Sequence, residues 1–211
     1  MAYMCAECRQ VGCKMRDLTK TMDCCPSKND AVQEQARNLY QEEENFRIAN
    51  TAAKVEAEGY GRLCRMEEIM LFAKRAGYHK IGLVFCMGLH NEAREVSKIL
   101  HHNGFEVVSV ICKNGAVPKS VIGLTDGDTL SGCAQEVMCN PIGQALLMNQ
   151  EQTEFNILLG LCVGHDTLAL KYLEAPVTVL AVKDRVAGHN PLAPIYVANS
   201  YYKKRFYGEK V

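Results

Sequence analysis

The chain has 211 residues, of which 48% are hydrophobic, and its 24 basic and 24 acidic residues balance to a formal net charge of zero. This hydrophobic content supports a substantial core, and the balanced charge gives no electrostatic reason to expect binding to nucleic acid or to an acidic membrane surface. No apolar stretch reaches the ~18 residues of a membrane span, and the N-terminal "MAYMCAECRQ" shows no secretory signal. We therefore expect a cytoplasmic protein that binds neither nucleic acid nor a membrane.

Cysteine is the outlier in the composition, with eleven residues. In a reducing cytoplasm such a count points to metal binding or thiol chemistry rather than to disulfides, and an odd number excludes complete pairing within the chain. Five of the cysteines lie within residues 1–30, a segment with little apolar material. Something other than a hydrophobic core must order this segment.

Residues 1–30 are predicted to form a cysteine-rich, metal-binding head. Cys5 and Cys8 form a CxxC motif, and "DCCP" later supplies Cys24 or Cys25. A CxxC turn followed by two later ligands is typical of a tetrahedral zinc site, and iron–sulfur clusters accept the same thiolates. A thioredoxin-like redox motif is disfavoured, because four residues before the motif leave no room for a strand. The predicted ligands, with Cys24 as the alternative to the last one, are Cys5, Cys8, Cys13 and Cys25.

Residues 31–77 are predicted to form a helical segment. Residues 31–58 contain neither Pro nor Gly, and their apolar side chains fall on one stripe. The "EGYG" sequence that follows breaks this pattern, and a second helix is predicted over 63–76, ended by Gly77.

From residue 78 onward, apolar runs of strand length alternate with amphipathic segments, which predicts an α/β domain over 78–211. Continuous apolar runs predict parallel strands that are covered on both faces. We expect an open, mostly parallel sheet of four or five strands with flanking helices, in addition to the cysteine-rich head. Residues 113–138 could hold a short strand and a turn. The other predicted strands are 80–86, 105–112, 155–162 and 177–182, and the predicted helices are 91–104, 141–150 and 167–173.

Three of the predicted strands end in cysteine, at Cys86, Cys112 and Cys162. The carboxyl ends of parallel strands share one edge of a sheet, and neighbouring strands are ~4.8 Å apart. Cys139 belongs at the same edge, because it just precedes a predicted helix whose dipole favours a thiolate there. Since ligands of open α/β sheets bind at this edge, we predict a site formed by these four cysteines, with His165 in or just outside the ligand shell.

Four thiolates suit Zn²⁺ or an iron–sulfur cluster and exclude Mg²⁺ and Ca²⁺. A tetrahedral zinc ion would draw the sulfur atoms to roughly 3.8 Å from one another. Strand spacing is wider than this, which favours an iron–sulfur cluster such as a 4Fe–4S cluster at the predicted edge site. The simpler alternative is that cysteines at strand ends are ordinary core residues.

Polar candidates also follow the last predicted strand, in "VKDRVAGHNP". Lys183 and Arg185 at the carboxyl edge could hold an anionic ligand, and His189 could act as an acid or base near neutral pH. The structural alternative is a salt-bridged loop closed by a bond between His189 and the backbone. No G-x-G-x-x-G motif occurs, so dinucleotide binding is not expected.

The chain resembles an uncharacterised prokaryotic family of cysteine-rich, metal-binding proteins that share a domain of unknown function. The similarity is carried by "CAEC", "KIGLVFCMGLHNEA", "GFEVVSVICK", "MCNPIGQALLMN", "NILLGLCVGHD" and "VTVLAVKDRVAGHNP". It implies metal binding without naming a reaction, and residues 16–30 and Cys133 match none of these motifs. By their positions in these motifs, the cysteines to which the resemblance assigns metal binding are Cys5, Cys8, Cys13, Cys86, Cys112, Cys139 and Cys162.

Three functions follow from these patterns. The first is a metal-binding protein with zinc or iron–sulfur sites and a redox or sensing role, which would work with a redox protein partner. The second is an enzyme that acts on a small, anionic ligand at the carboxyl edge of the sheet. The third is a non-enzymatic metal-handling or interaction module.

Overall fold

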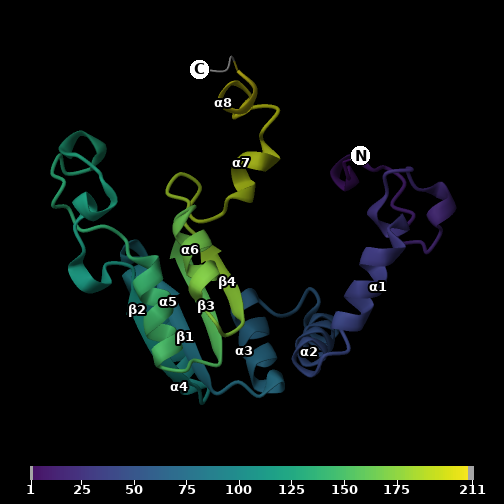
Figure 1. Ribbon diagram of the computed structural model, residues 1–211, viewed down its shortest axis with the longest axis horizontal. Helices are drawn as coiled ribbons and strands as arrows, with labels where there is room; N and C mark the ends of the chain where they lie inside the picture. The colour runs from purple at the N-terminus through teal and green to yellow at the C-terminus, as the bar shows by residue number, and fades with distance from the viewer. Residues whose placement is uncertain (1, 209–211) are drawn as a thin grey trace. The chain divides into compact units, whose positions relative to one another are not determined.

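The computed structural model describes residues 2–208 (Figure 1). The chain divides into two compact units, Met1–Glu58 and Gly59–Val211. The domain boundaries expected from composition, after residues 30 and 77, stay a prediction.

The first unit consists of the cysteine-rich head and two helices, α1 (Asp30–Leu39) and α2 (Glu43–Gly59). The single helical stripe predicted over 31–58 is divided between these helices by a turn at residues 40–42. The head contains three short 3-10 turns, and among residues 2–30 only Gly12 and Thr21 are buried. The head therefore lacks a hydrophobic core, as its composition predicted.

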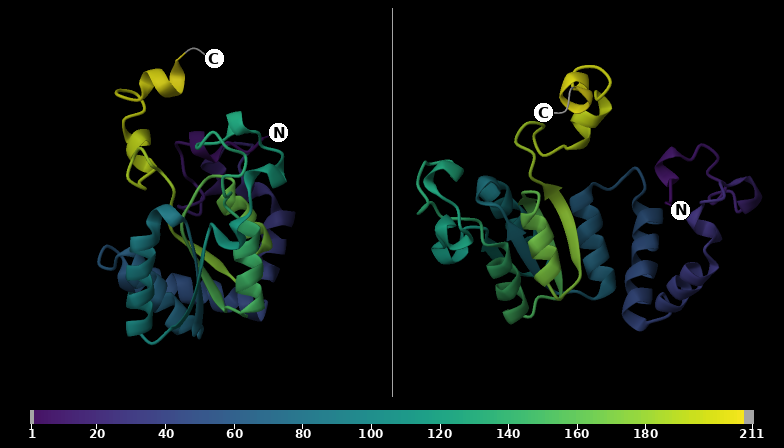
Figure 2. Two further views of the ribbon diagram at one scale, coloured as in Figure 1. Left: turned by 90° about the vertical axis from the view of Figure 1, so that its left-hand side faces the viewer. Right: turned by 45° about the horizontal axis from the view of Figure 1, so that its top comes forward.

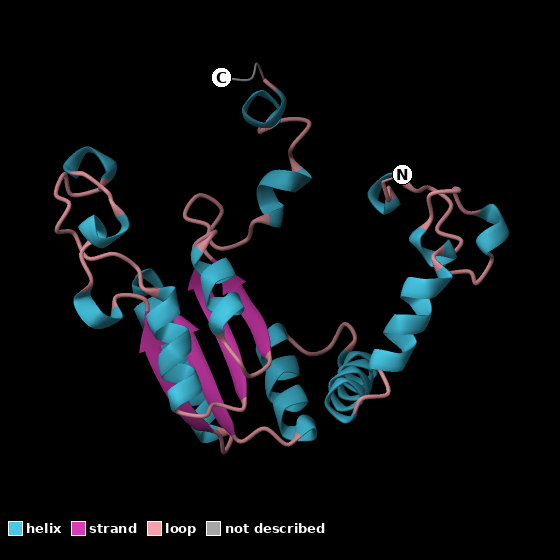
Figure 3. Ribbon diagram, in the orientation of Figure 1, coloured by secondary structure: helices cyan, strands magenta, loops and turns pink. Residues whose placement is uncertain are grey.

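The second unit begins with α3 (Arg65–Ala76), which ends at Gly77 in the left-handed conformation that glycine adopts without strain. Its sheet has four parallel strands, and all four arrows in Figure 3 point the same way. The strand order is β2-β1-β3-β4. The strands are β1 (Lys80–Phe85), β2 (Glu106–Ile111), β3 (Phe155–Leu161) and β4 (Val177–Val182). The predicted parallel α/β sheet is thus confirmed.

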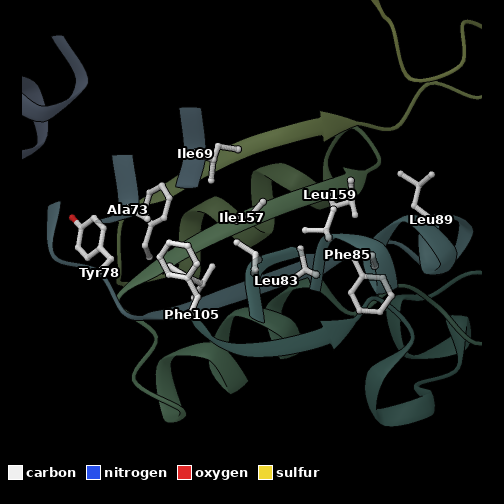
Figure 4. Close-up of a cluster of buried hydrophobic side chains, with 14 of the residues drawn as sticks. Ile69, Ala73, Tyr78, Leu83, Phe85, Leu89, Phe105, Ile157 and Leu159 are labelled. Atoms are coloured by element: carbon white, nitrogen blue, oxygen red, sulfur yellow. The ribbon is translucent and has the colours of Figure 1, made fainter. Parts of the chain in front are cut away.

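Helices cover both faces of this sheet. On one face, α3 and α4 (His90–His102) bury a cluster around Leu83 and Ile157 (Figure 4). On the other face, α5 (Pro141–Gln150) and α6 (His165–Tyr172) pack on Val84 and Leu158. Adjacent residues of one strand thus face opposite cores, which explains why the strands read as continuous apolar runs.

The strand order places β1 between β2 and β3, so the chain leaves β1 toward one side of the sheet and later returns to its other side. This reversal of direction falls between β1 and β3, and open α/β sheets bind ligands at the carboxyl ends of the strands beside such a point. The residues that follow these two strands are therefore the first candidates for a functional site.

Two long excursions leave the carboxyl edge of the sheet (Figure 2). Residues 113–138 form three short 3-10 turns, and the isolated bridge between Pro118 and Val137 replaces the short strand expected there. Residues after β4 carry two short helices, α7 (Leu192–Tyr196) and α8 (Lys203–Tyr207). Within residues 2–208, no helix is long and apolar enough to cross a membrane.

Candidate functional site

The sheet itself brings two of the strand-end cysteines together. Cys112 donates its backbone N–H to Phe85 O at 2.9 Å, and Cys86 donates its own to Leu159 O at 3.1 Å. The hydrogen-bond ladder thus continues one residue beyond the strands. Cys86 and Cys112 are 8% and 2% exposed, so their thiols are held at the buried floor of the carboxyl edge.

The start of α5 brings a third thiol from a distant part of the chain. Asn140 donates its backbone N–H to Cys112 O at 2.7 Å, and its side-chain oxygen caps α5 by accepting from Gly143 N at 2.9 Å. The side chain of Asn114 joins the end of β2 to the start of α5, because it donates hydrogen bonds to Ile111 O and Asn140 O. As a result, the sulfur atoms of Cys139 and Cys112 lie 3.7 Å apart and share a hydrogen bond.

Cys86, Cys112 and Cys139 form one hydrogen-bonded series of thiols, with Cys112 in the middle. The hydrogen bond to Cys112 and burial raise the pKa of Cys86. The bond to Cys139, together with burial, raises the pKa of Cys112. The pKa of Cys139 is lowered to about 7 by its bond to Cys112 and by the positive charge of Lys113. Cys139 is therefore the member of the series that most readily becomes a thiolate, and a thiolate is the form that binds metals.

Gln144 positions this edge, although the sequence analysis did not single it out. Its fully buried side chain donates from Nε2 to Phe85 O at 3.0 Å and to Val110 O at 2.7 Å. These carbonyls lie just before Cys86 and Cys112, so one amide joins the ends of β1 and β2. The sequence signal that could have identified Gln144 is its position as a polar residue among the apolar, buried residues of α5.

Cys162 reaches the edge from β3 but has a different partner. Its half-buried sulfur accepts a hydrogen bond from Arg185 Nη2 at 3.3 Å, and this contact raises the pKa of Arg185. Cys162 is near enough to Cys139 for their charges to interact. Burial lowers the pKa of the neighbouring His165, as do the charges of Lys113 and Arg185.

The two other predicted polar residues have different roles. A methyl group placed on Gly88 would lie 3.1 Å from Lys183 Nζ and 3.9 Å from Cys86 Sγ, so this ammonium borders the thiols. His189 instead accepts the backbone N–H of Asp184 at its Nδ1, at 3.2 Å, and donates its own N–H to Asp184 O. His189 thus closes its own loop, which is the structural alternative considered for it.

Soft thiolate donors at this edge match Zn²⁺ or an iron–sulfur cluster, and the 3.7 Å separation of Cys112 and Cys139 suits ligands of one centre. Within residues 2–208, however, no three His, Cys, Asp or Glu side chains converge closely enough to hold a metal ion as they stand.

The head contains a second group of thiols. All five of its cysteines line one hollow of about 170 Å³, together with Gly12, Thr21 and a few apolar side chains. Cys8 N donates to Cys5 O at 3.2 Å, which closes the turn of the CxxC motif. A hydrogen bond from the backbone of Ser27 lowers the pKa of Cys25, and Cys24 lines the same hollow.

The comparisons with known proteins now define the class of this chain. Residues 24–180 match the family model described as a protein of unknown function, DUF1847, and the chain belongs to this family. An uncharacterized protein of the archaeon Methanocaldococcus jannaschii is 46% identical to it over 166 residues, which cover 79% of this chain and 83% of that protein. No solved structure matches the chain. The matched region contains all four edge cysteines but only the last two of the head.

Proposed function

We propose that this protein binds metal through cysteine thiolates and serves a redox or sensing role. The observation that carries the proposal is that the thiols at the ends of β1 and β2 and before α5 lie at one edge of the sheet, with the sulfur atoms of Cys112 and Cys139 3.7 Å apart. Cys86 and Cys112 belong to the hydrophobic cluster on one face of the sheet, but the edge thiols are also bordered by the positive charges of Lys113, Lys183 and Arg185. Cations beside thiols favour thiolates and would offset the negative charge of a thiolate–metal centre.

For the edge site we propose an iron–sulfur cluster, with Cys86, Cys112, Cys139 and Cys162 as ligands and zinc as the alternative. Cys86 and Cys112 follow adjacent strands whose spacing exceeds the sulfur separation around a single tetrahedral ion. The 3.7 Å separation of the Cys112 and Cys139 sulfur atoms matches such an ion and is what supports zinc as the alternative. Such a cluster would supply one-electron chemistry when bound. The role of the protein would then be to exclude water from the buried side and to tune the centre through Lys113, Lys183 and Arg185.

For the head we propose a zinc or iron–sulfur site with Cys5, Cys8, Cys13 and Cys25 as ligands. The support is the combination of a hollow lined by thiols with the absence of a hydrophobic core among residues 2–30. In small segments of this kind, the free energy of metal binding replaces that of core packing. Between the adjacent cysteines we favour Cys25, because its lowered pKa favours the thiolate.

Two other functions have some support. An enzymatic role for the edge site is favoured by the cationic residues Lys183 and Arg185 beside the thiols, which suit a small, anionic ligand. A non-enzymatic metal-handling or interaction role needs only the thiols of the head.

The test is anaerobic purification of the full chain, followed by elemental analysis and visible absorption spectroscopy. We expect bound iron or zinc, and we expect Cys139→Ser to lower the metal content of the edge site. Cys133→Ser is the matched control, because Cys133 is exposed in the 113–138 excursion. A colourless, metal-free protein whose four edge thiols all react with a thiol reagent would refute the proposal.

A further inference from the structure

Two of the edge thiols stand at the two ends of the 113–138 excursion. Cys112 is the last residue before the excursion and Cys139 is the first after it, and their sulfur atoms lie 3.7 Å apart. The backbone joins the same two ends, because Asn140 donates its N–H to Cys112 O at 2.7 Å. The excursion thus closes on itself at the point where the two thiols meet.

The two thiols differ in their access to solvent. Cys112 is 2% exposed, and its sulfur atom accepts the backbone N–H of Met87 at 3.2 Å. Cys139 is half-buried and lies outside the sheet, in the segment that leads into α5. A small reagent that arrives from solvent therefore meets Cys139 first, and the sulfur atom of Cys112 is then the neighbouring thiol.

The backbone favours Cys139 over Cys86 as a bonding partner of Cys112. Cys86 and Cys112 directly follow paired parallel strands, and the backbone N–H of each continues the hydrogen-bond ladder. Cys139 lies outside this ladder, while the hydrogen bond of Asn140 keeps its segment in contact with Cys112. A disulfide needs sulfur atoms about 2.05 Å apart, so the thiols of Cys112 and Cys139 have to approach by roughly 1.7 Å, which rotation about side-chain bonds supplies.

We infer that Cys112 and Cys139 form a reversible disulfide when hydrogen peroxide oxidises the protein, and that this bond locks the base of the 113–138 excursion. In the first step the Cys139 sulfur attacks the peroxide, an S–O bond forms, the O–O bond breaks and one water leaves. The Cys112 sulfur then attacks the Cys139 sulfur, an S–S bond replaces the S–O bond, and a second water leaves. The two thiols together lose two electrons and two protons, which reduce the peroxide to water. Neither step requires a bound metal.

The experiment uses the full-length protein, reduced and treated with a chelator, so that the outcome does not depend on the proposed metal site. An equimolar amount of hydrogen peroxide is added, and digestion without reductant followed by mass spectrometry identifies the linked peptides. We expect the peptides that contain Cys112 and Cys139 to be joined, with the loss of two hydrogen atoms, and dithiothreitol to separate them again. The amide hydrogens of Lys119 and Met138, which donate across the base of the excursion, should exchange about tenfold more slowly in the oxidised protein.

Cys133→Ser is the matched control, because Cys133 lies in the same excursion but is exposed, and this variant should form the link as wild type does. Cys86→Ser should also keep the link, whereas Cys139→Ser should lose it. A link from Cys112 to Cys86, a link from Cys139 to Cys133, or oxidation that leaves Cys112 as a free thiol would overturn the disulfide. The linked peptides are measured in the wild-type protein, so the test holds even where a cysteine variant fails to fold.

Discussion

At the scale of single residues, the edge site depends on polar groups that are buried among apolar ones. Gln144 is the clearest case, because its amide nitrogen serves two carbonyls at the ends of β1 and β2 while its Oε1 has no partner among the described residues. Leaving one end of a buried amide unsatisfied costs free energy. The residue is therefore explained by the backbone that it holds in place, at Phe85 just before Cys86 and at Val110 two residues before Cys112.

Replacing Gln144 with Leu should lower the free energy of unfolding by about 1 kcal/mol, because Phe85 O and Val110 O each lose a side-chain donor inside the core. Both carbonyls keep a partner in the ladder between β1 and β2, so the loss is that of one amide donor. Urea denaturation would measure the change. Gln150→Leu, at the exposed end of the same helix, is the control and should stay within about 0.5 kcal/mol of wild type. Equal stability of the two variants would show that the buried amide is dispensable.

At the scale of elements, the first turn of α5 determines where Cys139 lies. Asn140 caps this helix through Gly143 N and exchanges hydrogen bonds with Asn114. A methyl group on Gly143 would lie 2.3 Å from Asn140 Nδ2, so the corner also requires glycine at that position. The cap, the glycine and the loop are therefore one assembly that places the third thiol beside Cys112.

Asn140→Ala should destabilise the protein by about 1 kcal/mol, since it removes the side-chain acceptor at the helix start. It should also weaken metal binding at the edge, because Cys139 is then less firmly positioned. Thermal unfolding and metal titration measure the two effects. Asn140→Asp keeps an oxygen for Gly143 N and should retain most of both properties. If Asn140→Ala matched wild type in both measurements, the cap would not position Cys139.

The segment 113–138 contains an ion pair of its own, between Lys119 and Glu136. Lys119 and Ser131 hold Glu136, and they lower its pKa to about 2 from an ordinary value of 4.5. A lowered folded-state pKa stabilises the fold above the unfolded value, and that contribution is lost as the pH falls from about 4.5 toward 2. The excursion should therefore open in this acidic range before the sheet does.

Pepsin, which works in this range, would report the opening by cleavage near Leu130, whose side chain is 97% exposed. Glu136→Gln should make the rate of cleavage much less dependent on pH, because the titrating group is gone. A wild-type cleavage rate that is constant between pH 4.5 and 2, once corrected for the activity of pepsin on a control peptide, would show that this ion pair does not close the excursion.

At the scale of the whole molecule, the two units are stabilised by different means. Both large hydrophobic clusters lie in the second unit, whereas the head has a hollow lined by thiols in place of a core. The sheet should consequently persist without metal, and the head should not. This difference can be tested on the intact chain.

Treating the full-length protein with a strong chelator should make residues 2–30 sensitive to protease, while amide hydrogens of β1 and β3 stay protected from exchange. Both strands are buried along most or all of their length, so their opening requires unfolding of the sheet. Hydrogen exchange followed by mass spectrometry measures both regions in one sample. A head that stays resistant after metal removal would show that its order does not depend on a metal.

Much of the fold could be predicted from local patterns. The second helix and all seven elements predicted after residue 78 lie within two residues of the observed bounds, because their apolar spacing and flanking residues act locally. The 40–42 turn within the first helical stripe was missed, since no proline or glycine marks it. The role of Gln144 and the pairing of Arg185 with Cys162 could not be predicted from local patterns either, because both contacts join distant parts of the chain.

The sequence by itself determined the parallel α/β sheet, the strand-end cysteines and a head that cannot form a core, because each of these follows from the identity of neighbouring residues. The tertiary structure alone decided which thiols meet. With β1 between β2 and β3, Cys86 has the ends of both neighbouring strands beside it, and the return of the chain after the 113–138 excursion places Cys139 against Cys112. Strand order and loop return are set by packing of the two helical layers, which no single segment encodes.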